Sequence, residues 1–227
     1  MSNQTHLTIV GVVLAGGLSR RMFAGQPVGG DKGLLDLAGR TMIDHVIHRL
    51  APQVSHMVVN ANGDPDRLEH LHKRLWLPVV ADTVEGFVGP LAGVLAGMRW
   101  TAAHVPAVTH IVSVSSDAPF LPGDLVARLA AAAAGQPPKL QHAIAMARSL
   151  GELHPVIALW PVVLADDLEA ALRSGVRKVL VWTDRHGTIP VDFSALDIGG
   201  TAVDPFFNAN TPAELDEARR LLALMAA

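Results

Sequence analysis

An apolar run near the start of the chain, residues 9–15 (IVGVVLA), is followed at once by Gly16 and Gly17. Apolar and β-branched runs of this kind are typical of strands buried in the centre of a parallel sheet. Two glycines directly after such a strand allow backbone N–H groups to approach an anion closely, although a glycine pair is more often a plain turn. The junction therefore predicts an α/β core with a ligand position at the strand's end.

Basic residues continue the same connection. Arg20 and Arg21 follow the glycines, and Lys32 comes eleven residues after Arg21 within the segment 30–33 (GDKG). Together they supply the positive charge that several phosphate oxygens require. The connection lacks the Gly-Lys-Ser/Thr of a P-loop and the GxGxxG fingerprint of a dinucleotide site. We interpret it as a phosphate-binding loop of another kind.

Strand and helix patterns alternate along the chain, which predicts βαβ units and a parallel sheet. The strand patterns cover residues 8–15, 55–60, 77–81, 109–115, 142–148, 155–160 and 188–192, and the helical patterns cover 41–51, 64–75, 90–103, 122–134, 162–173 and 212–225. Thr211, followed three residues later by Glu214, predicts a capping box at the last helix.

Composition excludes several classes of protein. The 227 residues are 50% apolar and 17% charged, which suits one domain, 1–227, with a sizeable core. The net charge of −3, from 18 basic and 21 acidic residues, argues against a nucleic-acid partner. The absence of cysteine excludes disulfides, and no run is long enough to span a membrane. We expect a cytoplasmic protein without a membrane partner.

Six blocks along nearly the whole chain resemble a known family. They are LAGG-x-S-x-R-M with the following Asp31-Lys32, then VVNAN (58–62), AD (81–82), GPLAG (89–93), SDAP (116–119) and FNANTP (207–212). In order and spacing these blocks are similar to those of the molybdenum cofactor guanylyltransferases. The resemblance implies a single Rossmann-like nucleotidyltransferase domain with a mostly parallel central sheet flanked by helices on both faces. It further implies a nucleotide-binding half at about 7–135 and a pterin-cofactor-binding half at about 140–227.

The resemblance implies a site for GTP. The residues it assigns to the nucleotide are Leu14, Ala15, Gly16, Gly17, Lys32, Asn60, Asp82, Pro90, Leu91 and Asp117. Lys32, Arg21 and Asp117 are implied as catalytic, with Lys32 holding the triphosphate. Gly16 favours guanine, because related enzymes for cytidine nucleotides tend to have alanine there. Without the family, a solvated Lys32 and an ordinary helix start at Pro90 would be the preferred interpretations.

Asp117 is the strongest single candidate for chemistry. It follows the predicted strand 109–115, so its carboxylate is expected at the sheet edge where open α/β folds bind ligands. A capped turn before Pro119 is the alternative. The resemblance favours a Mg²⁺ ligand, and Mg²⁺ typically takes one or two carboxylates together with water and phosphate oxygens.

A second group of residues is implied for molybdopterin. Asn208 and Asn210 lie two apart, so on an extended segment their side chains would point the same way. Their alternative is a turn before the last helix, and both descriptions can hold. His154, Arg177 and Lys178 align with family segments near the pterin more loosely.

The implied reaction transfers GMP from GTP to the terminal phosphate of molybdopterin or Mo-molybdopterin, releasing pyrophosphate. Other proteins of molybdenum cofactor biosynthesis and molybdoenzyme chaperones are implied as partners. The alternatives are a cytidylyl- or sugar-phosphate nucleotidyltransferase and a noncatalytic nucleotide-binding chaperone of the cofactor. One departure from the family is an insertion of about five residues between Met22 and Asp31, which we interpret as a flap over the phosphates.

Overall fold

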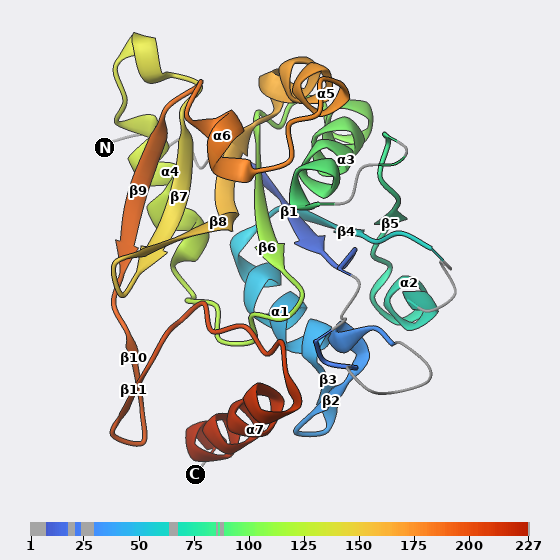
Figure 1. The fold of residues 1–227 in the computed structure, drawn as a ribbon, viewed down its shortest axis with the longest axis vertical. Coiled ribbons are helices and arrows are strands. Elements are labelled where there is room, and N and C mark those ends of the chain that lie inside the picture. The colour runs from blue at the N-terminus through green and yellow to red at the C-terminus, as the bar shows by residue number, and fades with distance from the viewer. Residues whose placement is uncertain are drawn as a thin grey trace.

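The computed structural model describes residues 8–17, 21–23, 30–63, 68–84, 86 and 89–226. Within these residues the main sheet has seven strands in the order β5-β4-β1-β6-β8-β7-β9 (Figure 1). The strands are β1 (Ile9–Leu14), β4 (His56–Asn60), β5 (Val79–Val80), β6 (His110–Ser115), β7 (Ile144–Ser149), β8 (Glu152–Pro161) and β9 (Thr188–Phe193). The expected strands and the mostly parallel sheet are confirmed.

Strand β8 alone runs against the others in this sheet, since it pairs antiparallel with both β6 and β7. Its reversal comes from a tight turn at Leu150 and Gly151, where both residues have positive φ, 49° and 84°. Two successive positive φ values match the twist of a two-residue hairpin. The same device joins β10 (Leu196–Ile198) to β11 (Thr201–Val203) at Gly199 and Gly200.

Helices cover both faces of the sheet. One face carries α1 (Met42–Leu50), α2 (Glu69–Leu75) and α4 (Leu125–Ala134), and the other carries α3 (Pro90–His104), α5 (Ala165–Arg173) and α6 (Val179–Thr183). In β1, Ile9 and Val13 face the first layer, whereas Val10 and Val12 face the second. This alternation follows from the two-residue period of a strand and explains why the whole run is apolar.

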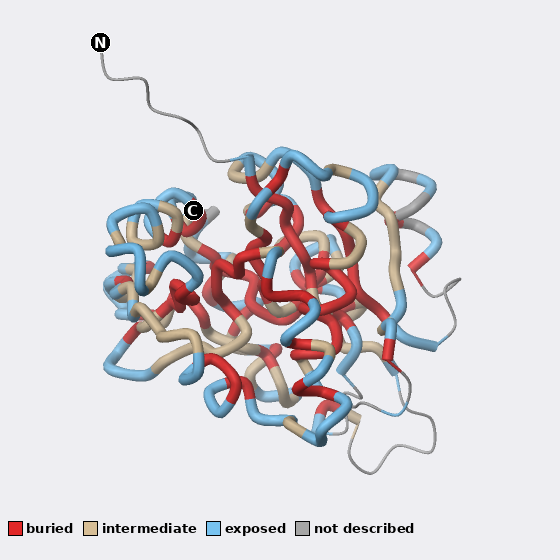
Figure 2. The backbone as a smooth tube through the Cα atoms, turned by 90° about the horizontal axis from the view of Figure 1, so that it is seen from above, coloured by how far each residue is buried: buried red, intermediate tan, exposed pale blue. Residues whose placement is uncertain are grey.

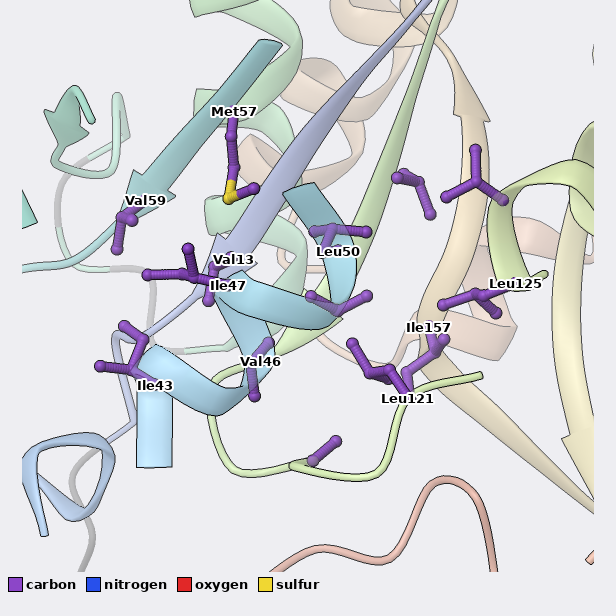
Figure 3. Close-up of a cluster of buried hydrophobic side chains, with 14 of the residues drawn as sticks. Val13, Ile43, Val46, Ile47, Leu50, Met57, Val59, Leu121, Leu125 and Ile157 are labelled. Carbon is purple, nitrogen blue, oxygen red and sulfur yellow. The ribbon is translucent and has the colours of Figure 1, made fainter. Parts of the chain in front are cut away.

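The core is thus divided into two clusters by the sheet. Figure 3 shows part of the first, where Ile43, Val46, Ile47 and Leu50 of α1 point toward β1 and neighbouring strands. Residues that are buried lie in the centre of the molecule, and exposed residues surround them (Figure 2). None of the helices in the described ranges is long and apolar enough to cross a membrane.

A third, smaller cluster lies beyond the carboxyl ends of the strands. It joins α7 (Pro212–Ala226) to β10–β11 and to the short hairpin of β2 (Asp36–Leu37) and β3 (Arg40–Thr41) (Figure 1). The predicted capping box is confirmed, because Glu214 N donates to Thr211 Oγ1 (3.2 Å) and Thr211 N donates to Glu214 Oε2 (2.9 Å). The hairpins and α6 were not expected from the sequence.

Candidate active site

The carboxyl ends of three parallel strands lie at one level of the sheet. Leu14, the last residue of β1, pairs with Asn60 of β4 and Ser115 of β6. Because β4 and β6 lie on opposite sides of β1, the strand order reverses here, which is where open α/β sheets form a ligand crevice. A cavity of about 780 Å³ occupies this position.

Twelve residues predicted for the site line this cavity. They are Leu14, Ala15, Gly16, Gly17, Arg21, Lys32, Asn60, Asp82, Pro90, Asp117, Asn208 and Asn210. The two asparagines predicted for the pterin thus share one cavity with the residues predicted for the nucleotide. Gly89, which belongs to the recognised block 89–93, lines it as well, and five further lining residues were not predicted for the site, namely Asp31, Asn62, Ser115, Ser116 and Val156.

Lys32 lies at the junction of the two groups. Its ammonium group makes an ion pair and hydrogen bond with Asp117 Oδ2 and donates to Asn210 Oδ1 at 2.7 Å. Ser115 Oγ donates to the other carboxylate oxygen, Oδ1 of Asp117. Only 4% of the Asp117 side chain and 16% of the Lys32 side chain are exposed, so solvent screens this charge pair little.

The position of Lys32 is set by a turn of 3₁₀ helix, η1 (Lys32–Leu34). Asp31 precedes this turn and accepts a hydrogen bond from Gly33 N at 2.9 Å. A side chain on Gly33 would begin 3.5 Å from Ser116 Oγ, so the turn lies directly against the residue before Asp117. Asp31 belongs to the Asp31-Lys32 pair recognised in the sequence. Here it caps the turn, a role that Asp residues commonly have.

Asn208 and Asn210 are held beside Asp117 by the backbone. Ala209 N donates to the carbonyl oxygen of Asp117 at 3.1 Å, and Asn210 N donates to Glu214 Oε2 at 2.8 Å. Asn208 Oδ1 is buried and accepts no hydrogen bond within the described residues. Buried polar atoms in native structures usually have a hydrogen-bond partner, so this oxygen is an exception among the described residues.

Asp82 is clamped by two asparagines at the other end of the cavity. Asn60 Nδ2 donates to Asp82 Oδ1 at 3.0 Å, and Asn62 Nδ2 donates to Asp82 Oδ2 at 2.7 Å. Asn62 Oδ1 accepts from Asp82 N at 2.8 Å. The carboxylate is therefore fixed in one plane. Asn62 was missed as a site residue. It falls in the recognised VVNAN block two residues after Asn60, and this position was the sequence signal that could have identified it.

Glycines let α3 approach the sheet beside this clamp. A Cβ on Gly93 would lie 2.2 Å from Asn60 Oδ1, and one on Gly97 would lie 2.5 Å from Val12 Cγ2. Gly16 differs, since its Cβ would lie 3.4 Å from Asn62 Nδ2 and 3.7 Å from Asn60 Oδ1. The last two values are ordinary van der Waals distances. The protein's own packing therefore requires glycine at 93 and 97 but not at 16.

Pro90 is the first residue of α3, as expected, and lines the cavity with Gly89. Gly89 has a φ of 154°, a backbone conformation that residues with a Cβ rarely adopt. Leu91 is not among the lining residues; it is buried in the core between α3 and the sheet. The predicted contact of Leu91 with the nucleotide stays a prediction.

His154, Arg177 and Lys178 also lie outside the cavity lining. His154 Nε2 lies 2.6 Å from Ser149 Oγ, and burial lowers the pKa of its imidazole, with Asp204 and Glu152 acting in the opposite direction. Arg177 and Lys178 are exposed before α6. Arg177 donates to the carbonyl oxygens of Leu172 and Val176, both at 3.2 Å.

Two predicted features fall on undescribed positions. Ser19 and Arg20 of the loop and residues 24–29 of the insertion lie outside the described residues. The two ends of the insertion are described: a Cβ on Gly30 would lie 2.7 Å from Phe23 Cζ, so the aromatic ring lies against the Gly30 backbone. Phe23 and Gly30, which flank the undescribed residues of the insertion, therefore lie next to each other.

The chemistry available in the cavity is that of charged and polar oxygen and nitrogen groups. Arg21 and Lys32 supply cations, and Asp31, Asp82 and Asp117 supply carboxylates. Among the described residues, no three His, Cys, Asp or Glu side chains gather to form a protein-only metal site. The arrangement suits a polyanionic ligand that brings oxygen ligands of its own.

Comparison with known proteins identifies the family of the chain. Residues 11–187 match the model of a MobA-like NTP transferase domain. The molybdenum cofactor guanylyltransferase of Bradyrhizobium sp. (strain ORS 278) is 48% identical over 99% of this chain and 98% of its own length. The protein of the same name from Mesorhizobium japonicum is 46% identical over 96% of this chain and 97% of its own length.

The fold is also found in solved structures. A molybdopterin-guanine dinucleotide biosynthesis protein A from Archaeoglobus fulgidus has a TM-score of 0.68 at 24% identity, covering 95% of this chain and 99% of that one. A Bacillus anthracis protein assigned as a glucose-1-phosphate thymidylyltransferase has a TM-score of 0.68 at 12% identity, covering 94% of this chain and 95% of that one. The family match and the two near-full-length relatives show that the chain belongs to the MobA-like NTP transferases.

Proposed function

We propose that this protein transfers GMP from GTP to the terminal phosphate of molybdopterin or Mo-molybdopterin, giving the guanine dinucleotide form of the molybdenum cofactor and pyrophosphate. Support comes from the relatives at 46% and 48% identity, which are named molybdenum cofactor guanylyltransferases. The observation that carries the proposal is the contact of Lys32 with both Asp117 and Asn210. One cation thus links the residues proposed for the nucleotide with a residue proposed for the acceptor.

The guanine end of the cavity is proposed to lie at Gly16 and the Asp82 clamp. Asp82 presents a carboxylate, an acceptor group, whose orientation is fixed by Asn60 and Asn62. Guanine carries N–H donors on its base-pairing edge, so the chemical match is favourable. Gly16 leaves open the space that an alanine methyl group would fill beside Asn62, which supports room for a purine.

Mg²⁺ is the metal that the site fits. Asp117 is a buried carboxylate of the cavity lining, and the side-chain oxygens of Asp31, Asp82, Ser115 and Ser116 belong to residues of the same lining. One protein carboxylate is enough for Mg²⁺, because this ion usually fills the rest of its coordination shell with water and phosphate oxygens. We propose that Asp117 holds the ion. When bound, Mg²⁺ would neutralise the growing negative charge on the phosphates.

The reaction asks the protein for positioning and charge neutralisation. An oxygen of the acceptor phosphate attacks the α-phosphorus of GTP; the new P–O bond forms as the α–β bridging bond breaks, and pyrophosphate leaves with the electron pair. Lys32 and Arg21 are the cationic residues among the described cavity lining, and they are suited to the charge on the departing phosphates. Asn208 and Asn210 would orient the acceptor.

Pyrophosphate release tests the proposal. Purified protein with Mg²⁺ is given GTP or CTP, and molybdopterin or a sugar phosphate as acceptor. We expect release with GTP and molybdopterin together and at least about a hundredfold less with CTP, the discrimination of a hydrogen-bonding pocket. Faster release with CTP or with sugar phosphate would assign the protein to the corresponding nucleotidyltransferase. Tight GTP binding without any release would support a chaperone instead.

A further inference from the structure

Ser149, His154 and Asp204 form a hydrogen-bonded cluster outside the cavity lining. Ser149 Oγ donates to Asp204 Oδ1 at 2.6 Å, and His154 Nε2 lies 2.6 Å from the same Oγ. A serine hydroxyl has one proton, which goes to Asp204, so the imidazole must be the donor of the other bond. The chain of bonds therefore runs from His154 through Ser149 to Asp204.

The cluster joins three distant parts of the chain. Ser149 ends β7, His154 lies in β8, and Asp204 follows β11. Ser149 is 2% exposed, and the side chains of His154 and Asp204 are 15% and 26% exposed. Hydrogen bonds this well shielded hold their partners more firmly than exposed ones. Asp204 is thereby tied to the β7–β8 hairpin.

Asp204 begins the segment that carries Asn208 and Asn210. Its Oδ1 also accepts from Phe206 N at 2.9 Å, and its carbonyl oxygen accepts from Phe207 N at 3.0 Å. Phe206 is buried, and its ring lies against the His154 imidazole with the ring centres 4.7 Å apart and the planes tilted by 54°. The other end of the segment is fixed where Ala209 N donates to the Asp117 carbonyl.

We propose that Ser149, His154 and Asp204 are positioning residues that hold segment 204–210 so that Asn208 and Asn210 meet the acceptor and Lys32. His154 thus acts through Asp204, without contacting the pterin. The inference rests on the proposed function, because it needs Asn208 and Asn210 to act in transfer. Ser149 and Asp204 were not candidates from sequence, since their bond spans 55 positions.

The test compares Asp204→Ala and Ser149→Ala with Asp204→Asn, which keeps an oxygen acceptor for Ser149 and Phe206. We expect the two alanine variants to lower kcat/KM for molybdopterin about tenfold or more, the usual scale for a misplaced orienting group, and Asp204→Asn to recover most of it. GTP dissociation constants, measured without acceptor, should change less than about threefold, because Asn60 and Asp82 lie on other elements.

The histidine is tested by a matched pair. His154→Phe keeps a ring against Phe206 but removes the donor, whereas His154→Gln keeps an N–H donor. We expect the kcat/KM for molybdopterin of His154→Phe to fall as far as that of Ser149→Ala, and that of His154→Gln to stay near the value of the parent protein. Asp197→Ala is the control, because Asp197 Oδ1 likewise accepts from a backbone amide, Gly200 N at 2.9 Å, in the exposed β10–β11 turn.

Asn210→Ala separates this inference from the proposed function. If Asn210→Ala leaves transfer unchanged, the proposed role of the segment is wrong. If Asn210→Ala impairs transfer but Asp204→Ala does not, only the positioning inference is overturned. It is also overturned if Asp204→Ala weakens GTP binding and transfer equally. If the proposed function and the positioning inference are both correct, Asp204→Ala should lower kcat/KM for molybdopterin far less in the Asn210→Ala background than in the parent protein.

Discussion

Lys32 and Asn210 lie 178 positions apart and are joined by a hydrogen bond of 2.7 Å from Lys32 Nζ to Asn210 Oδ1. Lys32 belongs to the connection after the first strand, and Asn210 to the segment before the last helix. The same ammonium group pairs with Asp117. Any loss of this cation therefore alters the environment of two proposed functional residues at once.

Replacing Lys32 by methionine should lower kcat for guanylyl transfer about a hundredfold to a thousandfold, the usual effect of removing one charge-stabilising group. The variant should also be less stable to heat, because Asp117 would stay buried without its cation. Steady-state kinetics and a thermal melt measure the two effects. Lys139→Met, at an exposed position, is the control and should change neither. Near-normal turnover of Lys32→Met would contradict the proposed role.

Asp117→Asn should abolish the Mg²⁺ dependence of turnover and most of the turnover itself. Asparagine keeps an oxygen for the bond from Ser115 but removes the charge that a divalent ion requires. A Mg²⁺ titration of the rate makes the comparison. Asp124→Asn, whose side chain is 60% exposed, serves as the control. An unchanged Mg²⁺ titration curve in Asp117→Asn would exclude it as the metal ligand.

Asn62 should affect GTP binding through Asp82. Asn62→Ala removes the donor to Asp82 Oδ2 and the acceptor of Asp82 N, and we expect about a tenfold weaker GTP affinity. Asn62→Asp should be worse, because it sets a second carboxylate beside the first. Calorimetry with GTP measures both. Equal affinities for the aspartate variant and the parent protein would contradict the clamp.

Gly16→Ala and Gly93→Ala form an opposed pair. The methyl group on residue 16 meets only ordinary contacts, so we expect unchanged stability and about a tenfold weaker GTP affinity, as the ligand loses space. On residue 93 it would lie 2.2 Å from Asn60 Oδ1, and overpacking should cost about 1 to 3 kcal/mol of unfolding free energy. Urea unfolding and GTP binding separate the two. Equal destabilisation by both substitutions would contradict this reading of Gly16.

The sequence sufficed for the parts of the site that lie directly after strands. The ends of β1, β4 and β6 are marked by abrupt changes from apolar to polar residues, and parallel pairing brings such ends to one edge. Asn60, Asp117 and Gly16 could therefore be found from local pattern and from the family blocks.

Contacts that depend on the turn between β7 and β8 could not be predicted from the sequence. The reversal of β8 follows from positive φ at Leu150, a residue type that gives no signal for such a turn. Gly199 and Gly200 did carry a hairpin signal, since paired glycines favour that turn. His154 was expected at the pterin. Its bond to Ser149 forms because the turn between β7 and β8 brings the two side chains together.

Two histidines should make the protein less stable at mildly acidic pH. Burial lowers the pKa of His110, with His142 acting in the same direction, and burial lowers that of His154. The unfolded chain then takes up protons near pH 6.5 before the folded one does, so the unfolding free energy falls as pH drops through that value and is highest above it. Urea unfolding at about pH 7.5 and about pH 5.5 measures the difference. The double variant His110→Gln, His154→Gln should show a smaller loss, whereas His48→Gln, at an exposed position, should not; an undiminished loss in the double variant would assign the acid sensitivity to other groups.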